Sequence, residues 1–166
     1  MGLILNIETA TKNCSVSISK DGSVVALKEL NEGKFSHAEK LHSFILDLVR
    51  EVAIEMHDLE AIAISKGPGS YTGLRIGVSA AKGLCYALEK PLISVPTLEI
   101  MALQVPLLEN ELAVPLLDAR RMEVYSQFIS TRKNIFRKVT ADIIDKDSYR
   151  EIFDSYHVCF LGYGAD

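Results

Sequence analysis

The sequence contains no tryptophan, three cysteines and five prolines among 166 residues, and these shortages speak against several classes of protein. Cys14, Cys85 and Cys159 are an odd number without C-x-x-C spacing, which speaks against a disulfide framework, a thioredoxin motif and a zinc knuckle. The low proline content and only ten glycines exclude collagen-like and low-complexity proteins. A reducing cytoplasm is therefore the expected location.

Long hydrophobic runs and an excess of positive charge are absent as well. No apolar run approaches the roughly 18 residues that a membrane helix needs, and the apolar start at Leu3 to Leu5 is broken by Asn6 and Glu8. The 18 basic and 22 acidic residues give a formal net charge of −4, the wrong sign for a protein that coats nucleic acid. We expect no membrane association, and nucleic acid only as a ligand shared with a partner.

The composition is that of an average globular domain, with 48% hydrophobic and 24% charged residues, and it allows a core without disulfides. Asp21-Gly22 is a two-residue hairpin signal, and Ser36 with Glu39 forms a capping box before an amphipathic helix. Apolar periodicity predicts strands at 3–7, 14–19, 24–30, 61–64 and 91–95, and helices at 36–56, 72–88 and 98–105.

The same order of elements begins again after Pro106. Strands are predicted at 114–117, 124–130, 135–139 and 158–161, with a short helix near 147–153. This repeat predicts an α/β fold with two lobes built on mixed sheets, residues 1–106 and 107–166, and chance similarity of two apolar strands is the alternative. The second lobe is predicted to be incomplete, because nothing in it corresponds to the helix at 72–88 and the strand at 91–95.

Five of the ten glycines lie between residues 67 and 83, where a strand leads into a helix. A phosphate cradle uses that placement, but the segment lacks the Gly-Lys-Ser/Thr of a P-loop, and the third glycine of a G-x-G-x-x-G motif would have to replace Thr72. Packing fits better, because small residues recur at every fourth position and give the helix one smooth stripe. The stripe consists of Gly69, Gly73, Gly77, Ala81 and Cys85. Its partner is predicted to be the first helix of the same chain, a helix of another molecule, or both.

Two acids are the strongest candidates for a nucleotide site. Residues 4–9 can be laid over residues 114–119, so that Glu8 and Asp118 each end a first strand and are followed by a small residue. If the loops after these strands face each other across a cleft, Glu8, Thr9 and Asp118 could hold Mg²⁺ and the phosphates of a nucleotide. The alternative is that both are ordinary acids at strand ends.

The histidines do not predict a metal site. His37 and His42 are five residues apart, which places their imidazoles about 140° apart around a helix, and both are expected to be solvated. His57 and His157 stand alone, without a cysteine or serine patterned as a nucleophile, so no catalytic triad is predicted. The basic segment 132–138 is predicted to be a hairpin that forms a solvated sheet edge or touches the phosphates of a nucleic acid.

Three segments give the chain a resemblance to a known family. They are Phe35 to Leu41 with the sequence FSHAEKL, Gly67 to Gly77 with GPGSYTGLRIG, and Leu117 to Tyr125 with LDARRMEVY. In these segments the chain resembles the bacterial TsaB family, and the match spans nearly the whole sequence. The resemblance implies the actin/Hsp70/sugar-kinase fold with two RNase H-like lobes. It also implies a part in making threonylcarbamoyladenosine beside the anticodon of tRNAs that read codons starting with A.

The resemblance further implies a non-catalytic subunit that activates TsaD, with the ATPase TsaE as another partner and tRNA bound through the complex. TsaD carries a metal-binding histidine pair four residues apart, which this chain lacks, and ATP with Mg²⁺ is implied only for the complex. Family members contact TsaD through the first two helices, here 36–56 and 72–88, and a homodimer is expected when the chain is alone. The interface residues expected from this placement are Leu41, Ile45, Gly69, Gly73, Gly77 and Ala81.

A function of a different class remains open from the sequence. An independent ATPase or small-molecule kinase of the same fold would use Glu8 and Asp118 to hold Mg²⁺ and phosphate. The family commonly has Asp where this chain has Glu8, which weakens the case for nucleotide binding by this chain alone.

Overall fold

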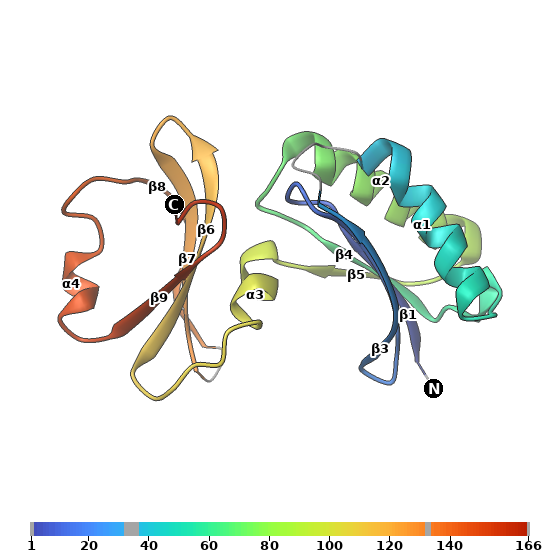
Figure 1. Ribbon diagram of the computed structural model, residues 1–166, viewed down its shortest axis with the longest axis horizontal. Helices are drawn as coiled ribbons and strands as arrows, with labels where there is room; N and C mark the ends of the chain where they lie inside the picture. The colour runs from blue at the N-terminus through green and yellow to red at the C-terminus, as the bar shows by residue number, and fades with distance from the viewer. Residues whose placement is uncertain (1, 32–36, 132–133, 166) are drawn as a thin grey trace. The chain divides into compact units, whose positions relative to one another are not determined.

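The computed structural model describes residues 2–31, 37–131 and 134–165, and the chain forms two compact units, Met1–Val95 and Pro96–Asp166. Each unit is built on one mixed β-sheet (Figure 1). None of the helices in the described ranges has the length and apolar composition that crossing a lipid bilayer requires.

The first unit contains a five-stranded sheet in the order β3-β2-β1-β4-β5. Its strands are β1 (Leu3–Glu8), β2 (Cys14–Lys20), β3 (Ser23–Leu30), β4 (Ala61–Ser65) and β5 (Leu92–Val95). β1 runs antiparallel to β2 and parallel to β4. Asp21 and Gly22 form the predicted hairpin turn with φ of 52° and 84°, because a two-residue turn that matches the strand twist needs positive φ at both positions.

Two helices, α1 (His37–Glu51) and α2 (Tyr71–Leu88), cover one face of this sheet (Figure 1). The alternation of β1 turns Leu5 and Ile7 toward the helices, where they join a buried core with Leu41 of α1. The opposite face carries polar members of the same strands, such as Asn6, whose amide donates to the hydroxyl of Ser17 at 3.2 Å. The first sheet therefore has one apolar, helix-covered face and one mixed face, on which Leu27 and Ile93 are exposed beside the polar residues.

The first helix ends earlier than the apolar periodicity predicted. Ala53 adopts a left-handed conformation with φ of 55°, and the N–H of Ile54 donates to the carbonyl of Val49 at 3.1 Å. This is the Schellman arrangement, which satisfies the last carbonyls of a helix and stops it. Met56, the last residue of the predicted helix, instead begins a short 3-10 helix, η1 (Met56–Asp58), and still packs against the core.

The second unit contains a four-stranded sheet in the order β8-β7-β6-β9. Its strands are β6 (Glu111–Arg120), β7 (Glu123–Ser130), β8 (Ile135–Ile143) and β9 (His157–Leu161), with the helix α4 (Arg150–Phe153) before β9. β6 runs antiparallel to β7 and parallel to β9, as β1 does to β2 and β4. The predicted repeat of the β-β-β-α-β order is confirmed, and no described residue after β9 forms a counterpart of α2 or β5.

The short helix α3 (Thr97–Ala102) belongs to the second unit. Ala102 is buried in one cluster with Ala113 of β6 and Ile129 of β7, whereas Val114 of β6 packs with the residues around α4 on the other face. The structural division therefore precedes α3, while the boundary expected from the sequence follows it, after residue 106. The reason is that the apolar side of α3 is buried against the second sheet.

Candidate functional site

The first candidate residue, Glu8, ends β1 on the sheet face opposite to α1 and α2. Its carboxylate Oε1 accepts hydrogen bonds from the backbone N–H of Ala10 at 2.6 Å and from the hydroxyl of Ser65 at 2.8 Å. Burial raises the pKa of Glu8 above its usual value, although these hydrogen bonds act to lower the pKa. Donors of the protein itself therefore already occupy Oε1 of the carboxylate that a nucleotide site would use to bind Mg²⁺.

The glycines of α2 face the loop that follows β1. A Cβ atom at Gly73 would overlap the carbonyl oxygen of Thr9, and a Cβ atom at Gly77 would overlap the Thr9 hydroxyl. A Cβ atom at Gly69, just before α2, would overlap the carbonyl oxygen of Ala10. Glycine permits this close approach of helix and loop because it has no side chain. The packing interpretation of the stripe is confirmed. The loop after β1 lies closest to the glycines, and His37 of α1, the predicted helix partner, also lies against Gly73.

This packing corrects the interface that the stripe suggested. The expected interface residues are engaged within the first unit: Leu41, Ile45, Gly69, Gly73, Gly77 and Ala81. All but the half-buried Gly69 are buried within the first unit, so they offer no surface to a second molecule. A stripe of small residues predicts which side of a helix is closely packed. It does not predict what packs there, because a helix, a loop or a strand can all approach small residues closely.

His37, the first residue of α1, is only 1% exposed, and its Nε2–H donates to the carbonyl oxygen of Thr11 at 2.9 Å. The prediction that His37 is solvated is wrong, whereas His42 is exposed as predicted. The missed signal is spacing, since His37 lies four residues before Leu41 and shares the buried side of α1. The imidazole thus ties the loop after β1 to the start of α1. The predicted cap at Ser36 lies outside the described residues.

Groups of the chain itself occupy the N-terminus of α2. The hydroxyl of Ser70 accepts from the N–H of Gly73 at 3.2 Å, and the N–H of Ser70 donates to the carbonyl of Ala10 at 2.6 Å. A phosphate cradle needs these N–H groups to face an anion. The glycine-rich segment 67–77 therefore serves to place α2 against the loop after β1.

Asp118, the second candidate acid, makes the same local contact as Glu8 in a different setting. Its Oδ1 accepts from the N–H of Arg120, two residues further on, at 2.7 Å. Asp118 is exposed and lies opposite Val124, on the sheet face that packs with α4, whereas Glu8 faces away from α1 and α2. The overlay of the two first strands holds for strand order but not for the sheet face, because a shift of one residue exchanges the faces.

Within the described ranges, no three His, Cys, Asp or Glu side chains gather closely enough to hold a metal ion. Of the predicted basic hairpin, Arg132 and Lys133 lie outside the described residues, and Arg137 forms an ion pair with Asp142. The guanidinium of Arg137 also lies 4.3 Å from the centroid of the Phe128 ring. Arg137 is therefore engaged within the second unit, in contacts that suit a planar guanidinium.

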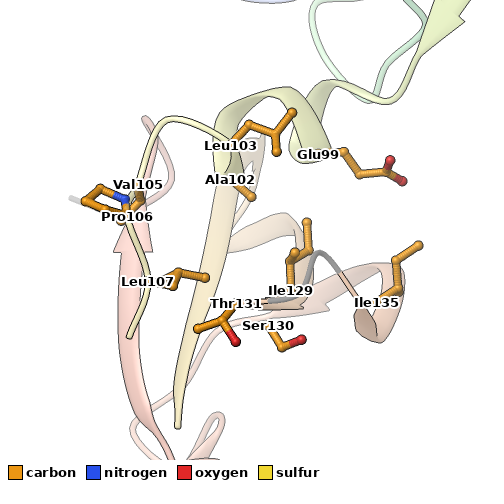
Figure 2. A pocket seen from close by; sticks show the side chains of 10 residues that line it. All are labelled: Glu99, Ala102, Leu103, Val105, Pro106, Leu107, Ile129, Ser130, Thr131 and Ile135. Atoms are coloured by element: carbon orange, nitrogen blue, oxygen red, sulfur yellow. The ribbon is translucent and has the colours of Figure 1, made fainter. Parts of the chain in front are cut away.

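The second unit contains an apolar cavity of about 290 Å³ beside α3 (Figure 2). Leu107, Ile129 and Ile135 contribute to its wall, and Glu99 is the one charged residue among the described residues of the lining. Neither Glu8 nor Asp118 lines this cavity. The cavity is therefore separate from both candidate acids.

Comparisons with known proteins agree with this architecture. Residues 32–153 match the model of the family described as TsaD, tRNA N6-adenosine threonylcarbamoyltransferase. The structure of YeaZ from Pseudomonas aeruginosa is similar over 89% of this chain and 69% of that chain, with a TM-score of 0.74 and 27% identity. A second structure from that organism, described as similar to peptidase YEAZ, has a TM-score of 0.75 at 26% identity over 89% of this chain and 68% of that chain. The fold and these similarities together define the class of this protein: it is an α/β protein of the actin/Hsp70/sugar-kinase fold.

Curated relatives identify the family within this class. The tRNA threonylcarbamoyladenosine biosynthesis protein TsaB of Escherichia coli K12 is 40% identical over 60% of this chain and 42% of its own length. The TsaB proteins of Bacillus subtilis and Haemophilus influenzae are 31% and 30% identical over 84% and 94% of this chain. The chain belongs to the TsaB family, and it spans between 42% and 63% of the length of these curated relatives.

Proposed function

We propose that this chain is a non-catalytic partner and activator of a TsaD-like subunit in threonylcarbamoyladenosine biosynthesis. The proposed reaction is threonylcarbamoyl transfer to the adenosine beside the anticodon of tRNAs that read codons starting with A. The observation that carries the proposal is the end of β1, where Ala10 and Ser65 hold the Glu8 carboxylate and Ser70 caps α2. In an enzyme, the carboxylate and the hydroxyl would have to contact the substrate. Here both groups bond to the chain itself, as expected for a binding partner that uses them to fix its helices. The names of the TsaB relatives support the pathway.

The proposed docking surface is the outward sides of α1 and α2, which we call the helix surface. Its anchors are Leu46 of α1, which is 51% exposed, and Tyr86 of α2, which is 90% exposed. Tyr71 adds a ring over which the guanidinium of Arg75 lies 4.3 Å from the centroid. Tyr and Arg are the residues that most often dominate protein interfaces. The buried glycines fix α2 against the loop after β1, which sets the orientation of this surface.

Binding to the TsaD-like protein of the same organism tests the helix surface. Tyr86→Glu and Leu46→Glu are each expected to weaken binding at least about tenfold, which corresponds to about 1.4 kcal/mol. Leu108→Glu is the matched control, because Leu108 is an exposed leucine of the second unit, and binding is expected to stay unchanged. Equal binding of all three variants in calorimetry would place the docking surface elsewhere.

The proposed complex includes a TsaE-like ATPase, ATP with Mg²⁺ bound in the complex and tRNA as a shared substrate. The competing function is an independent ATPase or kinase, and one observation favours it: Glu8 and Asp118 lie on corresponding strands, and each carboxylate accepts a hydrogen bond from the backbone N–H two residues further on. Calorimetry with Mg-ATP on the isolated chain separates the two functions. We expect no binding, whereas a dissociation constant below about 10 μM with turnover lost in Glu8→Ala would establish the competing function.

A further inference from the structure

The apolar cavity of the second unit lies between α3 and the adjoining ends of β7 and β8. Ala102, Leu103 and Leu107 form the side of α3 and the segment after it, and Ile129 and Ile135 belong to the strands (Figure 2). Ala102 and Ile129 share one buried cluster, against which Leu107 packs, so the two sides are held together. Within the described ranges, no residue of β9 or of the segment after it contributes to the lining.

The size and the lining of this cavity suit a small organic molecule. Its volume is about 290 Å³, and an apolar cavity of about 150 Å³ already stays dry and binds benzene. Pockets for small molecules are mostly apolar and begin at about 300 Å³. Leu103 is 56% exposed and Ile135 is 49% exposed, so apolar side chains at the rim remain open to solvent. A bound molecule would remove this apolar surface from water, which favours binding.

One carboxylate lies at the rim of the cavity. Glu99, in the first turn of α3, is half-buried, and its carboxylate lies on the Ile135 side of the cavity in Figure 2. Among the described residues, no hydrogen bond or ion pair engages this carboxylate. A ligand that covers the rim removes water from Glu99, and a charge without water needs an opposite charge beside it. A neutral or anionic ligand would leave that cost uncompensated.

We propose that this cavity binds a small organic cation, a primary amine of roughly ten non-hydrogen atoms with an apolar ring or chain. The apolar part lies between Ala102 and Ile129 and covers the rim, which supplies most of the affinity. The ammonium group donates to the Glu99 carboxylate, which supplies the preference for a cation. The described lining contains no aromatic side chain, so the carboxylate holds the cation and no ring face does.

The site is independent of the function proposed above. Every residue that carries it belongs to the second unit, whereas Glu8 and the helix surface belong to the first. Failure of the amine to bind would therefore leave the proposed partnership with a TsaD-like subunit untouched.

Three probes with the same phenyl ring and four-carbon chain test the class of ligand: 4-phenylbutylamine, 4-phenylbutanol and 4-phenylbutyrate. NMR titration of the full chain is expected to give a dissociation constant below about 1 mM for the amine, a value at least about tenfold higher for the alcohol, and no binding of the carboxylate. The resonances of Ala102, Ile129 and Ile135 are expected to shift. Equal affinity for amine and alcohol, no binding of the amine, or shifts confined to the first unit would each overturn the proposal.

Glu99→Gln tests the role of the carboxylate. Glutamine keeps the size of the side chain and removes the charge, so the amine is expected to bind at least about tenfold more weakly and the alcohol within about twofold of the wild type. Glu109→Gln is the matched control, because Glu109 is an exposed carboxylate of the same unit outside the lining, and no change is expected. Equal losses in both variants would reduce the effect to attraction by the net charge of −4 and rule the site out.

Ala102→Leu tests the cavity itself. The larger side chain occupies the space of the ligand, so both the amine and the alcohol are expected to lose binding, with circular dichroism checking that the variant is folded. Ile135→Ala changes an exposed residue that the fold does not depend on, and removal of its contacts is expected to weaken amine binding at least about fivefold. Undiminished binding of the amine to Ile135→Ala or to folded Ala102→Leu would place the amine elsewhere and overturn the proposal.

Discussion

Two glycines of α2 show how single residues set the position of a whole helix. Gly73 and Gly77 lie where a Cβ atom would overlap Thr9, so the loop after β1 touches the backbone of α2. A glycine in a helix costs about 1 kcal/mol relative to alanine, and this close contact offsets the cost. The small-residue stripe was predictable from the sequence. The contact with the loop after β1 was not predicted, because a spacing of four residues does not specify everything that lies across the stripe.

Alanine at two glycines of α2 is expected to have opposite effects on stability. Gly77→Ala adds a Cβ atom that overlaps the Thr9 hydroxyl and lies 3.1 Å from Cδ1 of Ile64, so we expect the free energy of unfolding to fall by about 1–3 kcal/mol. Gly83→Ala adds a Cβ atom in open space, and we expect a gain of up to about 1 kcal/mol. Urea denaturation measures both, and shifts of the same sign would contradict the packing described here.

Glu8→Gln is expected to change how stability depends on pH. Burial raises the folded-state pKa of Glu8 above its usual value of 4.5, so its contribution to stability is complete below about pH 4.5 and is lost as the pH rises through the folded pKa. Glutamine keeps an acceptor for Ala10 and Ser65 without ionising. The free energy of unfolding of the variant, relative to the wild type, is therefore expected to increase from about pH 4 to pH 7.

Urea denaturation at several pH values measures this difference for Glu8→Gln. Glu109→Gln is the control, because Glu109 is an exposed carboxylate, and its difference from the wild type is expected to change little with pH. A difference for Glu8→Gln that stays flat, or that falls as the pH rises, would contradict the burial of this carboxyl group.

At the scale of elements, apolar periodicity predicted the order of strands and main helices but not all of their ends. α1 stops early because Ala53 adopts a left-handed conformation that is uncommon for alanine and gives no sequence signal. β6 extends from Glu111 to Arg120, beyond the predicted 114–117, because its pairing with β7 continues past the apolar run. The ends of helices and strands depend on backbone hydrogen bonds and backbone conformation, so they are less predictable than the interiors, which depend on the burial of apolar side chains.

The segment between β8 and α4 is held to the second sheet by one carboxylate. The Asp142 side chain accepts a hydrogen bond from the Tyr149 hydroxyl at 2.8 Å and pairs with Arg137. Tyr149→Phe is therefore expected to lower the free energy of unfolding by about 1–2 kcal/mol, measured by urea denaturation. Tyr156→Phe is the control, since the described contact of Tyr156 is through its ring, and we expect a loss below about 0.5 kcal/mol. Equal losses in both variants would contradict the role of Asp142.

At the scale of the whole chain, the repeat in the sequence predicted the duplicated topology, with Glu8 at the end of β1 and Asp118 near the end of β6. The surroundings of those acids were not predictable, because Ser65 and His37 reach the end of β1 from segments distant in the sequence. The sheet face of Asp118 was not predictable either, since it depends on a shift of one residue. Composition and periodicity predict the fold and the order of its elements, whereas a site depends on which distant segments meet there.

Formation of threonylcarbamoyladenosine in tRNA by purified proteins tests the central claim most directly. We expect the TsaD-like and TsaE-like proteins of the same organism to modify tRNA efficiently when this chain is added and poorly without it. Tyr86→Glu is expected to lose most of this stimulation, because it weakens docking by at least about tenfold, whereas Leu108→Glu is expected to retain it. Modification that proceeds equally well without the chain, or stimulation by Tyr86→Glu equal to that by the wild type, would contradict the account.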